Sequence, residues 1–418
     1  MRQMKDSGIA WVGEIPQDWD IQKNKYIFKI TKDIVLPNKN YQLLSLTTNG
    51  IREKDENNVN GKVPENYDDY QIVRKKDLVM CLFDLDCSAV FAGLSKYEGM
   101  ISPAYKVLKT NNSKANERYY AYWFNYVSSK RYYKQYSKSL RYTLNADEFS
   151  RLFSPVPPLD EQQRIADFLD KECEKIDGLK TDTQTQIDML EQYKRSVITE
   201  AVTHGLNLNV PMKDSGAGWM PFVPKHWEVE KFKYHLRLRG VKNQIDKQVL
   251  SLYRELGIVP KNSRDDNHNV TSEDVSDYRY VRAGDFVVNK MKAWQGSVAI
   301  SDYEGIVSPA YYVYEFINDE IDKKYFHYLI RNKSYTTEFR RLSGGIREGQ
   351  WDLPAEALQN TLVLLPPLDE QKAIADYLDH KCAEIEQIIA DKKTQLDTLD
   401  DYKKSLIYEY VTGKKEAA

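Results

Sequence analysis

The sequence predicts a mixed α/β fold written twice: two globular domains, each followed by a long helix, with the helices paired as an antiparallel coiled coil in pseudo-twofold symmetry. The line PPLDEQQRIADFLDKEC at 157–173 returns half a chain later as PPLDEQKAIADYLDHKC at 366–382, in 418 residues. Short Val-, Tyr- and Ile-rich runs broken by turn residues precede each copy, and a seven-residue apolar pattern follows it. Such an internal repeat sets the architecture of the whole chain.

The repeat extends through the globular parts. The matched markers are Met4–Gly8 with Met212–Gly216, Trp11 and Trp19 with Trp219 and Trp227, Leu44–Leu46 with Leu250–Leu252, and Glu98–Tyr105 with Glu304–Tyr311. Between the markers the halves diverge, so one frame carries two different surfaces. The predicted segments are a globular domain at 1–155, a helical region at 156–208, a second globular domain at 209–365 and a second helical region at 366–418.

Each helical region begins at a double proline. Proline disfavours helix for the residue before it, and Asp160 and Asp369 stand where an N-cap belongs. We expect a short helix near Glu161–Leu169 and then a long one from about Lys171 to Thr203. A helix of that length spans roughly 50 Å, on the order of 15 base pairs of duplex as an upper bound.

Heptad spacing predicts which residues lie between the helices. The first line holds Ile176, Thr183, Leu190 and Val197, with Ile385, Lys392, Leu399 and Leu406 in the second copy. The second line holds Leu179, Gln186 and Tyr193, with Ile388, Gln395 and Tyr402. A narrow apolar stripe on a polar helix needs a partner, and the repeat supplies one. Antiparallel pairing would put the two globular domains at opposite ends.

Charge is segregated along the chain. The formal net charge is only −2, yet 128–142 holds five bases and no acid. No stretch approaches the roughly 18 apolar residues that cross a bilayer, and the N-terminus lacks the apolar core of a signal peptide. We therefore expect a cytoplasmic protein. The four cysteines and six histidines lack metal-ligand spacing, so we expect no cofactor and no metal.

Motifs of enzyme chemistry are missing from the sequence. An adenine methyltransferase would carry an Asn/Asp-Pro-Pro-Tyr/Phe loop, but Leu159 and Leu368 follow the two proline pairs. Gly344–Gly349 has the glycine spacing of a phosphate-binding loop, but Gln-Trp follows in place of Lys and a hydroxyl residue. We expect no catalytic residue, although carboxylates scattered along the sequence leave a nuclease site open.

Two variable α/β domains, each followed by a Pro-Pro-Leu-x-Glu-Gln line that opens a long helix, resemble the specificity subunits of type I restriction–modification enzymes. The resemblance covers essentially the whole chain and rests on the duplicated PPLDEQ and IADxLD. It implies two target-recognition domains, at Met1 to about Phe153 and about Met212 to Leu364, that each read half of a split double-stranded DNA sequence. It also implies a coiled coil that docks two adenine-N6 methyltransferase subunits, joined by two restriction and translocation subunits.

Two basic stretches are the first candidates for DNA contact. They hold Lys130, Arg131, Lys134, Lys138 and Arg141 in the first half, and Arg340, Arg341 and Arg347 in the second. Cations would clamp phosphates while the interleaved tyrosines contact sugars or base edges. Arg141 and Arg347 stand at the same place in each copy and are the strongest single pair. The alternative is a solvated helix face with its tyrosines turned to the core.

Two loops are further candidates. Lys290, Lys292 and Gln295 follow a predicted strand and can donate to phosphates or to base edges, whereas the first half has the acidic, apolar CLFDLD there. After each Leu-Ser-Leu lies a polar loop, with Thr47, Thr48, Asn49 and Arg52 in the first half and Arg254 in the second. An ordinary turn is the alternative for these polar residues.

Matched aromatic and acidic residues are interpreted structurally. The four matched tryptophans are expected to be packing anchors, because two unlike readers would not share base contacts. Asp160, Glu161, Asp369 and Glu370 are expected to cap helices and favour their dipoles, with methyltransferase docking as the alternative. The sequence thus predicts a non-catalytic recognition and scaffold subunit. A subunit of a compact system with a fused nuclease–methyltransferase partner, and a coiled-coil protein scaffold, which the charge of −2 favours, stay open.

Overall fold

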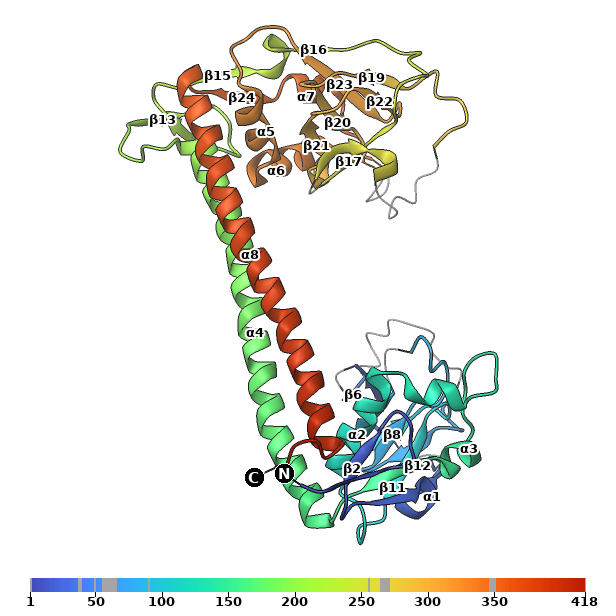
Figure 1. Cartoon of the computed structure of the whole chain (residues 1–418). Helices are drawn as coiled ribbons and strands as arrows, with labels where there is room; N and C mark the ends of the chain where they lie inside the picture. Colours follow the sequence, from blue (N-terminus) through green and yellow to red (C-terminus); the bar gives the residue numbers. More distant parts are fainter. Residues whose placement is uncertain are drawn as a thin grey trace. The chain divides into compact units, whose positions relative to one another are not determined.

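The computed structural model describes residues 2–36, 40–48, 50–54, 66–88, 91–254, 256–263, 271–345 and 351–417. The chain divides into two compact units. Unit 1 comprises Met1–Gln184 with Lys393–Ala418, and unit 2 comprises Thr185–Lys392. Each unit therefore joins one globular domain to a part of both long helices, which are α4 (Leu159–His204) and α8 (Leu368–Val411) (Figure 1).

The globular domain of unit 1 is built from twelve strands and four short helices. The strands are β1 Met4–Asp6, β2 Glu14–Pro16, β3 Asp20–Lys23, β4 Phe28–Thr31, β5 Leu44–Thr47, β6 Gly50–Glu53, β7 Gln71–Val73, β8 Leu78–Met80, β9 Ala92–Leu94, β10 Gly99–Ile101, β11 Lys106–Thr110 and β12 Phe153–Val156. The helices are α1 Asn24–Ile27, α2 Glu117–Ser129, the 3-10 helix η1 Tyr132–Tyr136 and α3 Ala146–Arg151. These bounds apply to the described part of unit 1.

The globular domain of unit 2 repeats this order in its described residues. The strands are β13 Met212–Asp214, β14 Phe222–Pro224, β15 Glu228–Lys231, β16 Leu236–Leu238, β17 Leu250–Tyr253, β18 Gly257–Pro260, β19 Arg279–Val281, β20 Phe286–Asn289, β21 Val298–Ile300, β22 Gly305–Val307, β23 Tyr311–Phe316 and β24 Leu362–Leu365. The helices are η2 Phe232–Tyr234, η3 Lys261–Ser263, η4 Ala293–Gln295, α5 Lys323–Arg331, α6 Lys333–Leu342 and α7 Ala355–Gln359.

Each domain is organised around one four-stranded antiparallel sheet. The strand order is β4-β11-β8-β9 in unit 1 and β16-β23-β20-β21 in unit 2, so the predicted repeat is confirmed in topology. The pairs β3–β12 and β15–β24 bring the first and last parts of each domain together next to the long helices. Helix α2 packs against β9 of one sheet, and α5 packs against β21 of the other. Asn116 and Asp322 cap the first turns of these helices, and the aromatic side chains on their inner faces are buried.

Each long helix is continuous, which corrects the prediction of a short helix followed by a long one. Helix α4 has 46 residues and α8 has 44, so α4 is about 70 Å long. The helices begin at Leu159 and Leu368, directly after proline, which is well suited to the start of a helix. The N-cap prediction for Asp160 and Asp369 is therefore wrong: both lie in the first turn, where a carboxylate still favours the helix dipole.

Within each unit the two long helices run antiparallel, as predicted. In unit 1 the Lys403 ammonium group lies 2.6 Å from Asp177, and Lys180 pairs with Asp400. In unit 2 Lys194 pairs with Glu386. In unit 1 the partner of Asp177 is Lys403 and the partner of Lys180 is Asp400, so residue numbers rise along α4 while they fall along α8. The placement of the two globular domains at opposite ends stays a prediction.

The first predicted heptad line is largely confirmed, and the second is wrong. Ile176, Thr183 and Val197 of the first line are buried, as are their counterparts Ile385 and Leu406. Leu179 and Tyr193 of the second line are 53% and 52% exposed, and Ile388 and Tyr402 are similarly exposed, with Gln186 and Gln395. The second inner line begins four residues after the first instead of three. It holds Lys180, Ile187, Lys194 and Ala201 in α4, of which Ile187 is only 2% exposed.

Candidate nucleic-acid interface

The glutamine of the repeated PPLDEQ line ties each long helix to its globular domain. Gln162 is fully buried, and its Nε2 donates to the carbonyl oxygens of Pro157 and Lys114, both at 2.8 Å. Its Oε1 accepts from the backbone N–H of Asn116, the N-cap of α2, at 2.8 Å. Gln371 makes the corresponding three bonds in unit 2. Each glutamine therefore fixes the helix that covers the sheet against the start of the long helix.

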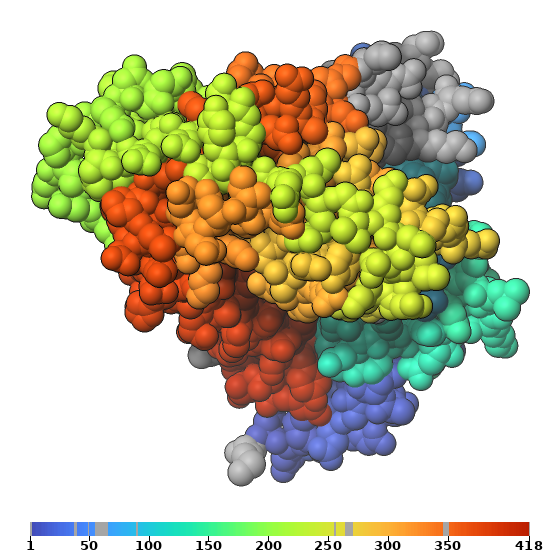
Figure 2. All heavy atoms as spheres, turned by 90° about the horizontal axis from the view of Figure 1, so that it is seen from above, coloured from blue at the N-terminus to red at the C-terminus, as the bar shows by residue number. Residues whose placement is uncertain are grey.

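The glutamate of the same line holds the anchor tryptophan. Trp19 is fully buried and its Nε1 donates to Glu161 at 3.0 Å, while Arg2 donates to the same carboxylate at 2.8 Å. Trp227 donates to Glu370 at 3.2 Å in unit 2, where Figure 2 shows the lime segment after α4 against the red-orange start of α8. The packing role predicted for these tryptophans is confirmed. The capping role predicted for both glutamates is wrong, because their carboxylates hold indoles.

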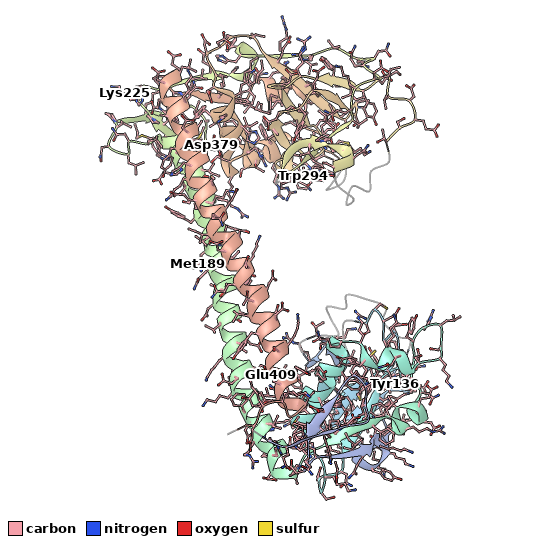
Figure 3. The ribbon with its side chains drawn as sticks, viewed as in Figure 1. Tyr136, Met189, Lys225, Trp294, Asp379 and Glu409 are labelled. Atoms are coloured by element: carbon pink, nitrogen blue, oxygen red, sulfur yellow. The ribbon has the colours of Figure 1, made fainter. Side chains whose placement is uncertain are left out.

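The last aspartate of IADxLD makes the third contact of each joint. The Tyr122 hydroxyl donates to Asp170 at 2.8 Å, and Arg118 donates to the same carboxylate at 2.6 Å. In unit 2 Tyr328 donates to Asp379 at 2.8 Å. Figure 3 shows Asp379 on the side of α8 next to its domain. The repeated line thus sets each domain on its helix through three equivalent groups, which we call the joint: Glu161, Gln162 and Asp170 in unit 1, and Glu370, Gln371 and Asp379 in unit 2.

In unit 2 the structure brings candidates from three segments together. They form what we call the unit 2 basic surface: Arg254, Lys290, Lys292, Gln295 and Arg340. Arg254, in the turn after β17, donates to Gln295 Oε1 at 3.1 Å. Lys292 precedes η4, which packs against α6, and α6 carries Arg340. The Lys290 backbone oxygen accepts from Leu353 at 2.9 Å, and its ammonium group lies 3.4 Å from Asp352.

Arg340 lies over two indole rings that contact each other. Its guanidinium carbon lies 5.9 Å from the ring centroid of Trp294 and 6.0 Å from that of Trp351. The two rings lie 5.3 Å apart, and Trp294 is fixed further because its Nε1 donates to the Met291 oxygen at 3.0 Å. Figure 3 labels Trp294 at the edge of the unit 2 domain. Neither tryptophan was among the predicted contact residues.

A half-buried histidine is linked through Arg331 to the turn that carries Arg254. The backbone N–H of Ile300 donates to His327 Nδ1 at 3.3 Å, and Arg331 contacts His327 Nε2 at 2.7 Å. Burial, with a further contribution from the Arg331 charge, lowers the pKa of His327 to about 4. Arg331 also donates to the backbone oxygen of Arg254. The turn that carries Arg254 is therefore attached to the helix α5 that covers the sheet.

Two predicted contacts of unit 2, Arg341 and Arg347, do not belong to the unit 2 basic surface. Arg341 is exposed, but its guanidinium makes two 2.7 Å hydrogen bonds to the buried carboxylate of Glu338 on its own helix. Part of its charge is therefore already compensated. Arg347, half of the pair ranked highest from the sequence, lies outside the described residues, as does Asn49 of unit 1.

In unit 1 the predicted cations gather around a shallow hollow of about 440 Å³. Lys130, Arg131 and Lys134 line it together with Tyr132 and Tyr142. Arg131 has a positive φ of 53°, which turns the chain sharply between α2 and η1. The Lys134 ammonium group lies 4.3 Å from the ring centroid of Tyr142. Lys138 and Arg141 follow in the exposed loop after η1.

The tyrosines of this stretch mostly serve the core. Tyr133 is fully buried, and Tyr132 stacks on Trp11 with ring centroids 4.4 Å apart. Trp11 Nε1 also donates to the hydroxyl of Tyr136, which Figure 3 labels, at 3.0 Å. The expectation that these rings contact DNA is therefore wrong for buried Tyr133, whereas it stays a prediction for Tyr132, which is half-buried and lines the hollow beside the cations.

The remaining candidates of unit 1 lie on the β5–β6 hairpin and beside it. Thr47 Oγ1 donates to the Gly50 oxygen at 2.8 Å, so its hydroxyl stabilises the turn, while Thr48 and Arg52 are exposed. The loop after β8 carries exposed Cys87 and half-buried Asp84 in place of the lysines after β20. The Asp84 N–H donates to the Arg141 oxygen at 3.2 Å. The equivalent loops of the two units thus present opposite charge.

Within the described parts of the chain, no group of three or more His, Cys, Asp or Glu residues is arranged to hold a metal ion. No helix in those parts is long and apolar enough to cross a membrane. The described residues define a protein with two domains of one topology, each fixed to a long helix pair by the same joint and each carrying its own set of exposed cations.

Comparison with known proteins identifies that class. The family model for the type I restriction modification DNA specificity domain matches residues 16–189 and 242–398. The MjaVIII specificity subunit of Methanocaldococcus jannaschii is 25% identical, with 96% of this chain and 93% of that protein covered. A chain from a structural study of type I R-M complex assembly has a TM-score of 0.69 at 12% identity, covering 96% of this chain and 99% of that one. The HsdS subunit from Thermoanaerobacter tengcongensis has a TM-score of 0.53 at 15% identity, covering 96% and 98%.

The chain therefore belongs to the family of type I restriction–modification DNA specificity subunits, and it has two target-recognition domains. The family resemblance inferred from PPLDEQ and IADxLD is confirmed.

Proposed function

We propose that this specificity subunit is non-catalytic and that each domain reads one half of a split target in double-stranded DNA. The observation that carries this proposal is the contrast between the joints and the surfaces. The joints repeat group by group, whereas the loop after β8 is acidic and that after β20 is basic. Two readers set on one frame suit two unlike half-sites. We place the readers at residues 1–155 and 209–365, and a subunit that binds chromosomal DNA works in the cytoplasm.

We propose all described candidates as DNA contacts, with the clustered exposed cations as the main ones. Lysine and arginine side chains on the unit 2 basic surface and around the unit 1 hollow would neutralise phosphates. The proposed contacts are Thr48, Arg52, Lys130, Arg131, Lys134, Lys138 and Arg141 in unit 1, and Arg254, Lys290, Lys292, Gln295, Arg340 and Arg341 in unit 2. Thr47, Asn49 and Arg347 remain predictions from the sequence alone. The Thr47 hydroxyl is hydrogen-bonded within its turn, and Asn49 and Arg347 lie outside the described residues.

We further propose that an exposed flank of the helix pair holds the methyltransferase subunits. Leu179 and Tyr402 belong to this flank in unit 1, and Tyr193 and Ile388 occupy the same repeat positions in unit 2. All four are roughly half exposed. Apolar side chains at matched positions of two units favour two copies of one partner, and restriction subunits would join through these.

Native mass spectrometry of the complex with its methyltransferase tests this docking. The double variant Leu179→Ser/Tyr402→Ser should lower the stoichiometry from two methyltransferase subunits per chain to one. Met189→Ser is the matched control, because Met189 is equally exposed on α4 but lies off this flank. Two retained subunits in the double variant would contradict the docking site. A single polypeptide carrying both methyltransferase and nuclease would instead indicate a compact system.

DNA recognition is tested by the methylation pattern of cells with and without the subunit. We expect a bipartite motif, and exchange of residues 212–364 for those of another family member should change one half of it. Binding to duplex DNA should weaken steeply with salt, because phosphate contacts release counterions. Equal binding to random and selected duplexes would refute recognition, and salt-independent behaviour would favour a protein scaffold.

A further inference from the structure

We propose that Leu140 reads a thymine in the half-site bound by unit 1, through the 5-methyl group that thymine carries in the major groove. The inference rests on the proposed function and extends it to a residue to which no motif or comparison assigns a role. Leu140 is 101% exposed, whereas the other exposed large apolar side chains of the described residues are at most 63% exposed. An aliphatic side chain held wholly in water gains favourable free energy from any partner that covers it.

The loop that carries Leu140, residues 137–143, is held together by its own hydroxyl groups. It follows directly after Tyr136, which Figure 3 labels. Ser137 Oγ donates to the Thr143 backbone oxygen at 2.8 Å, and Ser139 Oγ accepts from the Thr143 N–H at 2.7 Å. The loop therefore turns back on itself, with Leu140 in the turn.

The returning part of the loop is attached to the domain. The Leu85 N–H donates to the Tyr142 oxygen at 3.2 Å, and the Leu144 N–H donates to the oxygen of Leu82, which is a core residue, at 2.8 Å. Leu140 is thus presented by an ordered loop. Ordering the loop before DNA arrives lowers the entropy lost on binding, which favours recognition by a single side chain.

Charge favours duplex DNA over a protein surface as the partner. Lys138 and Arg141 lie on either side of Leu140 in the loop, and both are exposed. The neighbouring loop after β8 contributes Asp84 and Asp86, but both are half-buried, so cations predominate around the exposed leucine. Those cations would bind the phosphates next to the base that Leu140 contacts.

The width of the loop and the chemistry of leucine select the groove and the base. The backbones of two paired chain segments lie about 5 Å apart. With its side chains the loop is therefore wider than the minor groove, which is about 6 Å wide, but it fits the major groove of about 12 Å. Leucine neither donates nor accepts hydrogen bonds, and the thymine methyl is the apolar group that base edges present in the major groove.

Replacing thymine with uracil in the target duplex tests the proposal, because it removes the methyl group alone. The full chain with its methyltransferase would be used, and the relevant half-site is the one that stays unchanged when residues 212–364 are exchanged. The wild type should bind about three- to tenfold more weakly when uracil replaces one particular thymine there. Leu140→Ala should bind the thymine and uracil duplexes equally, whereas Leu140→Met, which keeps a long apolar side chain, should keep the preference.

Two controls separate this contact from a general effect. Leu36→Ala is the matched variant, because Leu36 is a 60% exposed leucine of unit 1 outside the 137–143 loop, and it should keep the full preference for thymine. Thermal unfolding of Leu140→Ala should match the wild type, because the side chain is fully exposed.

Three results would overturn the assignment. One is wild-type binding that no uracil replacement in this half-site weakens. Another is a Leu140→Ala variant that keeps the thymine preference, or that loses affinity equally for every duplex as in insertion between base pairs. The third is loss of methyltransferase from the Leu140→Ala complex in native mass spectrometry, which would indicate a protein contact. Failure of the proposed function is distinct, since the wild type would then select no sequence.

Discussion

Replacing Arg239 with methionine would leave a buried carboxylate in the sheet of unit 2, and unit 1 already contains a carboxylate in that setting. Arg239 donates to both oxygens of Asp285, at 2.8 and 2.9 Å, and the two side chains are only 9% and 5% exposed. Breaking a buried pair costs about 3–5 kcal/mol. Asp285 keeps its 2.8 Å bond from the Arg282 N–H, so we expect about 3 kcal/mol.

Asp77 of unit 1 shows the pH dependence to expect. It lies at the position equivalent to Asp285 and accepts from the Arg74 N–H at 2.8 Å, and burial raises its pKa. A raised pKa in the folded state means that protonation relieves the cost, so stability is present at low pH and lost as pH rises. The loss in Arg239→Met should therefore be larger at pH 7 than at pH 5.

Urea unfolding with hydrogen exchange of β20 would measure this loss. The double variant Arg239→Met/Asp285→Asn should recover at least half of it, because Asp285 then carries no charge, while Glu315, which Arg239 also contacts at 2.9 Å, keeps its pair with Arg237. Asp33→Asn is a surface control, since Asp33 pairs with Arg74 at an exposed site, and it should change stability by less than about 0.5 kcal/mol. An equal loss at both pH values, or a double variant no better than the single one, would refute the reasoning.

Three further predictions extend these tests. Ile187→Ala should cost about 2–3 kcal/mol in urea unfolding and Leu179→Ala less than about 0.5, because only Ile187 lies in the inner line; equal losses would restore the original heptad assignment. The wild type should lose stability as the pH falls from about 6.5 to 4, because the unfolded chain binds a proton at His327 there and the folded chain, in which the pKa of His327 is about 4, does not. His327→Gln should make this loss smaller, and an unchanged dependence of stability on pH would show that His327 does not cause it. Lys292→Ala should weaken binding to every duplex and lower the logarithmic salt slope by about 0.9, and sequence-dependent losses would argue for a base contact.

The frame of the fold was predictable because its evidence is duplicated in the sequence. Matched markers place the strands and joints of both domains without any knowledge of contacts. The second heptad line failed for a physical reason. Positions three and four residues after Ile176 both keep the seven-residue period, and hydrophobicity favours Leu179 over Lys180. The structure places Lys180 and Lys194 inward because their long chains cover apolar surface while their ammonium groups reach acids on the opposite helix.

The candidate contacts were predictable only where their evidence is local in sequence. Clustered cations such as those near Lys130 can be recognised in one short window. The arrangement around Arg340 cannot, because η4, α6 and the segment near Trp351 supply one group each and only the fold brings them together. A tryptophan in each of two polar loops was the available signal, and it has no spacing rule that would link the two.

The joint explains how one frame can carry readers that differ. Its glutamines bind backbone atoms, its glutamates bind the indoles of Trp19 and Trp227, and its aspartates bind tyrosines of the covering helices. None of these partners belongs to the loops that carry the proposed DNA contacts. A change of recognition surface therefore leaves the setting of the domain on its helix intact. Because both joint glutamines are buried and every member of the joint is hydrogen-bonded, the joint holds each domain in one orientation on its helix, and contacts with base edges need that constancy.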